Sequence, residues 1–162
     1  MTGRRLEERD VACWVLKANP KTYDLRAALE HGEDINGWTL HKTYRVQLMA
    51  PSQRCLLWLS GPDSSGVYAI GKLTDFAEED GHGGGPYWRD IAKANRRVPV
   101  VSISVVRLGT PIARAGLISD RRFADAEVIK MAAGSNPSYL NEAQLAAVKE
   151  RLPVPDIRQA GW

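Results

Sequence analysis

The chain has 162 residues, of which 44% are hydrophobic and 25% charged, and this composition predicts one globular domain with a core of its own. The formal net charge of +3 is compatible with nucleic-acid binding but does not by itself indicate it. No apolar run approaches the roughly 20 residues that a membrane helix needs, and no apolar run follows the charged N-terminus as in a signal peptide. We therefore expect a cytoplasmic protein without a membrane partner.

The first part of the chain predicts a strand, a turn and a short helix. Residues 1–10 are charged and are expected to form a flexible lead-in. Residues 11–16 form an apolar strand, which ends at Asn19-Pro20 because the residue before proline disfavours helix. Thr22 caps a helix over residues 23–31, and Gly32 stops it. The following segment alternates too poorly to predict a strand, so for its Trp38 core packing and ligand contact are equally plausible.

Residues 54–73 predict two antiparallel strands joined by a turn. The apolar run over residues 55–59 indicates a strand that is buried on both faces and therefore central in its sheet. Trp58 and Ser60 are two positions apart, so we expect them on the same face. Gly71 has no side chain and so leaves open space in the second strand. With this space, Trp58 and Ser60 indicate a small pocket, although a buried tryptophan beside a turn explains the same residues.

The second half begins with a glycine-rich loop, Gly81–Gly85, which lacks the Gly-Lys-Ser/Thr ending of a phosphate-binding loop. A mobile linker and a flap over a ligand both fit it. Residues 98–108 alternate as a strand that residues 109–111 end, and residues 112–133 are helical in pieces. Asn141 and Gln144 predict a capping box at the start of the last helix. Pro153 ends that helix, and residues 153–162 are expected to form a tail.

The two cysteines, Cys13 and Cys55, lie in apolar runs, where buried free thiols are favoured over a disulfide. His31, His41 and His82 have no spacing that suggests metal ligands. The sequence therefore predicts neither a metal nor a cofactor.

Several short motifs occur in an order that is similar to the EVE domain family of the PUA-like superfamily, which is related to YTH domains. They are LKANPKTYD at residues 16–24, a lone Trp38, LWLSG at 57–61, GVYAIG at 66–71 and GSNP at 134–137. The resemblance spans residues 11–152, which we take as the domain. It implies an α+β fold, a PUA-like partial β-barrel of mixed strands with flanking helices.

The resemblance also implies a function. EVE-like domains are associated with modified bases, chiefly modified cytosine in DNA, and prokaryotic members often accompany restriction systems. We therefore expect a noncatalytic module that reads 5-methylcytosine or 5-hydroxymethylcytosine flipped into an aromatic pocket, with RNA as an alternative ligand and a restriction-system protein as partner. By position, the pocket residues are Asn19, Trp38, Trp58, Ser60, Gly61 and Asn136. The tryptophans would be its walls, the serine and asparagines would bond the base edge, and the glycine would leave room.

Basic side chains supply candidate phosphate contacts, although such clusters are more often a solvated face. They are Lys17, Arg89, Lys93, Arg96, Arg97, Arg121 and Arg122. A nucleic-acid hydrolase is a competing interpretation, with Asp24 and Lys17 as its best candidates, but the sequence shows no carboxylate metal motif and no nucleophile elbow. A protein-interaction module is the third interpretation.

Overall fold

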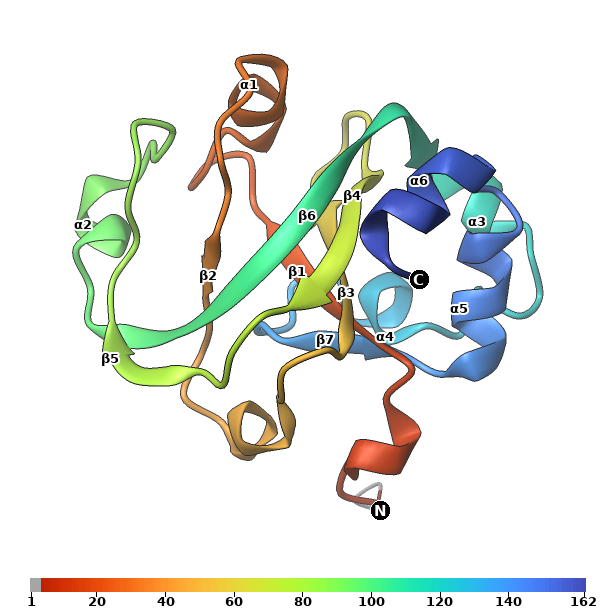
Figure 1. The fold of residues 1–162 in the computed structure, drawn as a ribbon, viewed down its shortest axis with the longest axis horizontal. Coiled ribbons are helices and arrows are strands. Elements are labelled where there is room, and N and C mark those ends of the chain that lie inside the picture. Colours follow the sequence, from red (N-terminus) through yellow and green to blue (C-terminus); the bar gives the residue numbers. More distant parts are fainter. Residues whose placement is uncertain (1–3) are drawn as a thin grey trace.

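The computed structural model describes residues 4–162, which form one mixed seven-stranded sheet (Figure 1). The strand order is β2-β6-β4-β3-β1-β7, and β5 pairs in addition with β6. The strands are β1 (Cys13–Ala18), β2 (Gly37–Thr39), β3 (Arg54–Leu59), β4 (Gly66–Leu73), β5 (Glu78–Gly81), β6 (Val98–Ala113) and β7 (Ser138–Leu140). Within the described residues the outer strands β2 and β7 do not pair, so the sheet is an incompletely closed barrel.

Short helices flank the sheet on both sides. They are α1 (Leu25–Glu30), α2 (Ile91–Ala94), α3 (Arg114–Ile118), α4 (Glu127–Lys130), α5 (Glu142–Lys149) and α6 (Val154–Ala160), with 3-10 turns at Glu8–Asp10 and Tyr44–Leu48. Helices α3 to α6 gather on one side, whereas α1 and α2 lie on the other side near β2 and β5 (Figure 1). This arrangement confirms the predicted α+β partial barrel with flanking helices. Across residues 4–162, none of these helices has the length and apolar character needed to cross a membrane.

Strand β3 is central in the sheet, as predicted, and forms a hairpin with β4. Strand β3 pairs antiparallel with β4 and parallel with β1, so it has a neighbour on each edge. Its side chains alternate between two cores because successive residues of a strand point to opposite faces. Cys55 and Leu57 enter the core that contains Trp38, whereas Leu56 and Trp58 enter the core that contains Phe123.

The predicted free thiols are confirmed. Cys13 and Cys55 are both buried and unpaired by any disulfide, and they belong to different cores. Burial raises the pKa of the Cys55 thiol to about 12 and that of the Cys13 thiol well above its usual range. Both thiols therefore remain protonated at neutral pH and act as small core side chains.

Local signals place some helix ends correctly. The capping box of α5 is confirmed, since the Asn141 side chain accepts a hydrogen bond from the Gln144 amide at 2.9 Å and the Gln144 side chain accepts one from the Asn141 amide. The cap of α1 is Asp24 rather than Thr22, because the Asp24 carboxylate accepts a hydrogen bond from the Ala27 amide. Helix α1 therefore begins later than predicted.

Pairing partners extend the sheet beyond the predicted strands. Trp38 pairs with Val101, which makes β2 out of a segment without clear alternation. The acidic stretch from Glu78 becomes β5 beside β6. Residues 109–111 do not end β6, because after a bulge Ile112 pairs with Val67 of β4.

Both ends of the described chain are more structured than expected. Of the predicted lead-in, residues 1–3 lie outside the described residues, and Leu6 is buried with its amide bonded to the Tyr44 hydroxyl. The segment expected as a tail contains α6, whose start at Pro153 uses the fixed φ of proline. The Trp162 indole then donates a hydrogen bond to the Gly71 carbonyl at 2.7 Å.

Candidate functional site

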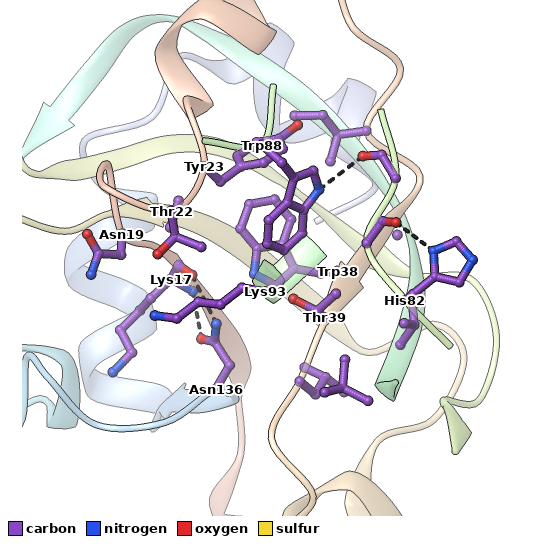
Figure 2. Close-up of a pocket in the computed structure, with 18 of the residues that line it drawn as sticks. Lys17, Asn19, Thr22, Tyr23, Trp38, Thr39, His82, Trp88, Lys93 and Asn136 are labelled. Carbon is purple, nitrogen blue, oxygen red and sulfur yellow. Dashed lines mark hydrogen bonds between the residues drawn. The ribbon is translucent and has the colours of Figure 1, made fainter. Parts of the chain in front are cut away.

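A cavity of about 660 Å³ opens on the side of the sheet that carries α1 and α2 (Figure 2). It lies among the end of β1, the connection from α1 to β2, the glycine-rich loop, and the turn that precedes Asn136. Its volume falls within the roughly 300–1,000 Å³ that is usual for small-molecule and cofactor sites. The cavity is therefore large enough to be a binding site.

Three aromatic side chains form one wall of this cavity: Tyr23, Trp38 of β2, and Trp88 (Figure 2). The Tyr23 ring makes edge-to-face contacts with both indoles, at centroid distances of 5.6 Å and interplanar angles of 73° and 74°. Such pairs are worth about 0.5–1.5 kcal/mol beyond their buried area, which keeps the rings in place. Burial, with a further contribution from Glu33, raises the pKa of Tyr23 to about 12, so its phenol is neutral.

The glycine-rich loop holds Trp88 against the cavity. The Trp88 indole nitrogen donates a hydrogen bond to the Gly84 carbonyl at 3.1 Å. A Cβ on Gly83 would lie only 2.3 Å from the Trp88 ring, so a larger residue would displace the ring or the loop. The structure thus makes this loop a cavity wall, and Trp88 is a site residue that the sequence did not predict. The position of Trp88 shortly after the glycine-rich loop was the sequence signal that could have indicated its role in the cavity.

Of the six predicted pocket residues, the structure brings Asn19, Trp38, Ser60 and Asn136 to the cavity. The side-chain amide of Asn136 already has partners. Its oxygen accepts a hydrogen bond from the backbone N–H of Lys17 at 2.8 Å, and its nitrogen donates one to the Lys17 carbonyl at 2.9 Å. It extends β1 rather than offering a free edge to a ligand. The Asn19 side chain accepts a bond from the Lys21 amide, and within residues 4–162 its NH₂ group has no partner. Asn19 and Ser60 can therefore serve a ligand.

The other two predicted residues, Trp58 and Gly61, do not line the cavity. Trp58 is only 2% exposed and lies in the core on the opposite face of the sheet, stacked on Phe123 at a centroid distance of 6.0 Å. Ser60 does not share its face because β3 ends at Leu59, after which strict alternation no longer applies. Gly61 has a φ of +109°, and a Cβ there would lie 3.1 Å from the Pro20 ring, so it makes room for Pro20.

Lys17 is a buried structural cation rather than an exposed phosphate contact. Only 8% of it is exposed, and its ammonium group donates hydrogen bonds to the carbonyls of Gly134 and Met131. Burial lowers the pKa of Lys17, as does the charge of Arg45, whereas Glu127 opposes the shift. Lys17 therefore ties β1 to the turn that forms one edge of the cavity.

The remaining predicted phosphate contacts are divided by the fold. Lys93 and Arg96 line the cavity and have no ion pair within the described residues. Arg97 pairs with Asp80 at 3.0 Å beside them, and Arg89 pairs with Asp24 at 2.6 Å and bonds the Pro20 carbonyl. Asp24 is thereby committed to Arg89 and to capping α1, which leaves it no evident catalytic role.

The segment between α3 and α4 carries Arg121 and Arg122, and it lies on the side of the sheet opposite α1 and α2 (Figure 1). The Arg122 guanidinium bonds Asp120 at 2.8 Å and Glu150 at 2.5 Å. The structure therefore does not bring these two arginines together with Lys93 and Arg96. Among residues 4–162, no group of three or more histidine, cysteine, aspartate or glutamate side chains could hold a metal ion.

The family model of the EVE domain matches residues 12–149 of this chain. The chain belongs to the EVE domain family. Its structure is also similar to solved structures at low sequence identity. A hypothetical protein from Leishmania major has a TM-score of 0.63 and 15% identity, with 90% of this chain and 96% of that chain covered. No curated protein matches the sequence.

Two human structures show the same fold as this EVE domain. The DUF55 domain of human thymocyte nuclear protein 1 has a TM-score of 0.58 and 14% identity, covering 85% of this chain and 96% of that chain. Human THYN1 protein, in complex with DNA that contains 5-methylcytosine, has a TM-score of 0.51 and 12% identity, covering 87% of this chain and 98% of that chain. These likenesses confirm the PUA-like fold expected from the sequence.

Proposed function

We propose that this EVE domain is a noncatalytic reader of a modified base, 5-methylcytosine or 5-hydroxymethylcytosine, which it takes out of DNA into the aromatic cavity. The observation that carries the proposal is the wall of Tyr23, Trp38 and Trp88 around a cavity of about 660 Å³. The fold supports it, since human THYN1 protein shares this fold and was solved with DNA that contains 5-methylcytosine. A restriction-system partner stays a prediction from the family.

The energetics require more than one kind of contact. Removing a base from its stack costs a few kcal/mol, and stacking on an aromatic side chain returns roughly 1–3 kcal/mol per base. The Asn19 amide and the Ser60 hydroxyl supply hydrogen bonds at the cavity, and Lys93 and Arg96 supply phosphate contacts. A single buried methyl group adds only about 0.8 kcal/mol, or roughly fourfold in affinity. Discrimination of 5-methylcytosine from cytosine is therefore expected to be modest.

Fluorescence anisotropy with matched oligonucleotides tests the proposal. The panel carries cytosine, 5-methylcytosine, 5-hydroxymethylcytosine, adenine and N6-methyladenine in single- and double-stranded DNA and in RNA. We expect a preference for a modified cytosine in DNA that is lost in Trp88→Ala, because that indole is a cavity wall. Trp162→Ala is the matched control, since its indole bonds Gly71 outside the cavity.

Circular dichroism first establishes that both variants are folded. Equal and salt-sensitive binding to every oligonucleotide would refute base reading and leave only a basic surface. A preference for RNA would overturn the choice of DNA.

A further inference from the structure

Glu33 is held at the cavity by the end of α1. Gly32 has a φ of +72°, and its amide bonds the Leu29 carbonyl at 3.2 Å while the Glu33 amide bonds the Ala28 carbonyl at 2.9 Å. These bonds form a Schellman motif, in which the residue after the glycine commonly packs as a hydrophobic contact. Here that position carries a carboxylate, which lines the cavity.

The Glu33 side chain extends from α1 toward the glycine-rich loop. Its Oε1 atom lies 3.3 Å from the position that a Cβ on Gly85 would occupy. Its charge also reaches the aromatic wall, because after burial it is the next contribution that raises the pKa of Tyr23. Glu33 therefore lies beside the glycine-rich loop that holds Trp88.

The Glu33 carboxylate is partly exposed and is not held by the fold. An anion near the C-terminal end of a helix is mildly unfavourable, and within residues 4–162 the Glu33 carboxylate has no ion pair and no hydrogen bond. A negative charge also opposes nucleic-acid binding. The carboxylate is therefore free to accept a hydrogen bond from a ligand in the cavity.

We infer that the Glu33 carboxylate accepts a hydrogen bond from the exocyclic amine of the bound base, an inference that rests on the proposed function. Cytosine presents an N4 amine, a donor that glutamate and aspartate accept, whereas thymine presents an O4 acceptor at the same place. 5-Methylcytosine and thymine carry the same methyl group and stack on the same rings. Glu33 is therefore the residue that separates an amino pyrimidine from a carbonyl pyrimidine.

The test compares 5-methylcytosine with thymine, each placed opposite an abasic site in otherwise identical duplexes, so that base pairing does not differ. We expect the wild-type protein to bind 5-methylcytosine roughly 5- to 150-fold more tightly than thymine. Glu33→Gln is expected to bring the two affinities within about threefold, since its amide can also donate to O4. Anisotropy titrations at one salt concentration give the ratios.

Two matched variants control the test. Glu30→Gln changes an exposed carboxylate on the same helix that does not line the cavity, and we expect it to keep the wild-type ratio. Asp34→Asn changes the neighbouring carboxylate, which also lines the cavity, and shows whether that carboxylate separates the two bases instead. Retention of the wild-type ratio in Glu33→Gln would overturn the inference, whatever the result for Asp34→Asn.

The failure of this inference can be told apart from that of the proposed function. A wild-type protein that prefers 5-methylcytosine to cytosine but binds thymine equally well would overturn only the role of Glu33. A wild-type protein without any preference for a modified base would overturn the proposed function itself.

Discussion

Truncation of Trp58 tests whether this residue belongs to the core or to a ligand pocket. The side chain is 2% exposed and its ring stacks on Phe123 at 6.0 Å, on the face of the sheet opposite the cavity. Trp58→Ala is therefore expected to cost about 3–5 kcal/mol of unfolding free energy, a large share of the 5–15 kcal/mol typical of a domain. For a chain of this length, the corresponding fall in Tm is roughly 6–20 °C.

Urea and thermal unfolding followed by far-UV circular dichroism measure this loss, with Trp58→Phe as a milder variant that keeps an aromatic ring on Phe123. At a temperature where Trp58→Ala is still folded, its preference among modified bases should equal that of the wild type, since Trp58 does not line the cavity. A variant with wild-type stability and no base preference would refute this reasoning and place the indole in the pocket.

Two further predictions concern charged residues. Lys93→Ala should weaken binding to every oligonucleotide and lower the slope of log affinity against log salt by about 0.7–0.9, because Lys93 lines the cavity. Arg122→Ala is the control and should leave that slope unchanged, because Asp120 and Glu150 hold its guanidinium. Equal changes in both variants would contradict the assignment of Lys93 as a phosphate contact. Burial raises the pKa of Glu127, but hydrogen bonds from Arg45 and Ser138 and the charge of Arg45 outweigh it, so the pKa lies below 4.5. The resulting stability is present above pH 4.5 and is lost as the pH falls through the folded-state pKa. In urea unfolding, the free energy of unfolding of Glu127→Gln should be about 1.5–3 kcal/mol lower than that of the wild type at neutral pH, and this difference should shrink in acid. A difference that does not change with pH would count against a stabilising ion pair between Arg45 and Glu127.

Features that depend on residues close together in sequence were predictable. The capping box of α5 lies within one turn, from Asn141 to Gln144, so no distant contact is needed to form it. The β3–β4 hairpin also needs only its two apolar runs and the turn between them. Three of the six predicted pocket residues followed in the same way, since Asn19, Trp38 and Ser60 carry the family motifs and do line the cavity.

Features that depend on pairing between distant segments were not predictable. Trp58 lies in the core rather than in the pocket because the inner strand β3 is covered on both faces, and Trp88 lines the cavity because the glycine-rich loop holds its indole. Asn136 reaches the cavity, but its amide is consumed by Lys17, a partner 119 residues away. That these hydrogen-bonding groups are already paired cannot be inferred from the sequence around either residue.

The sequence by itself determined the β3–β4 hairpin, the capping box of α5, the free thiols and the family, because each follows from local chemistry or from short motifs in order. Only the tertiary structure decided which side chains share the cavity. The sheet has two buried faces, and a shift of one position or the end of a strand moves a side chain from one face to the other. The carboxylate of Glu33 reaches the cavity because a left-handed glycine turns the chain at the end of α1.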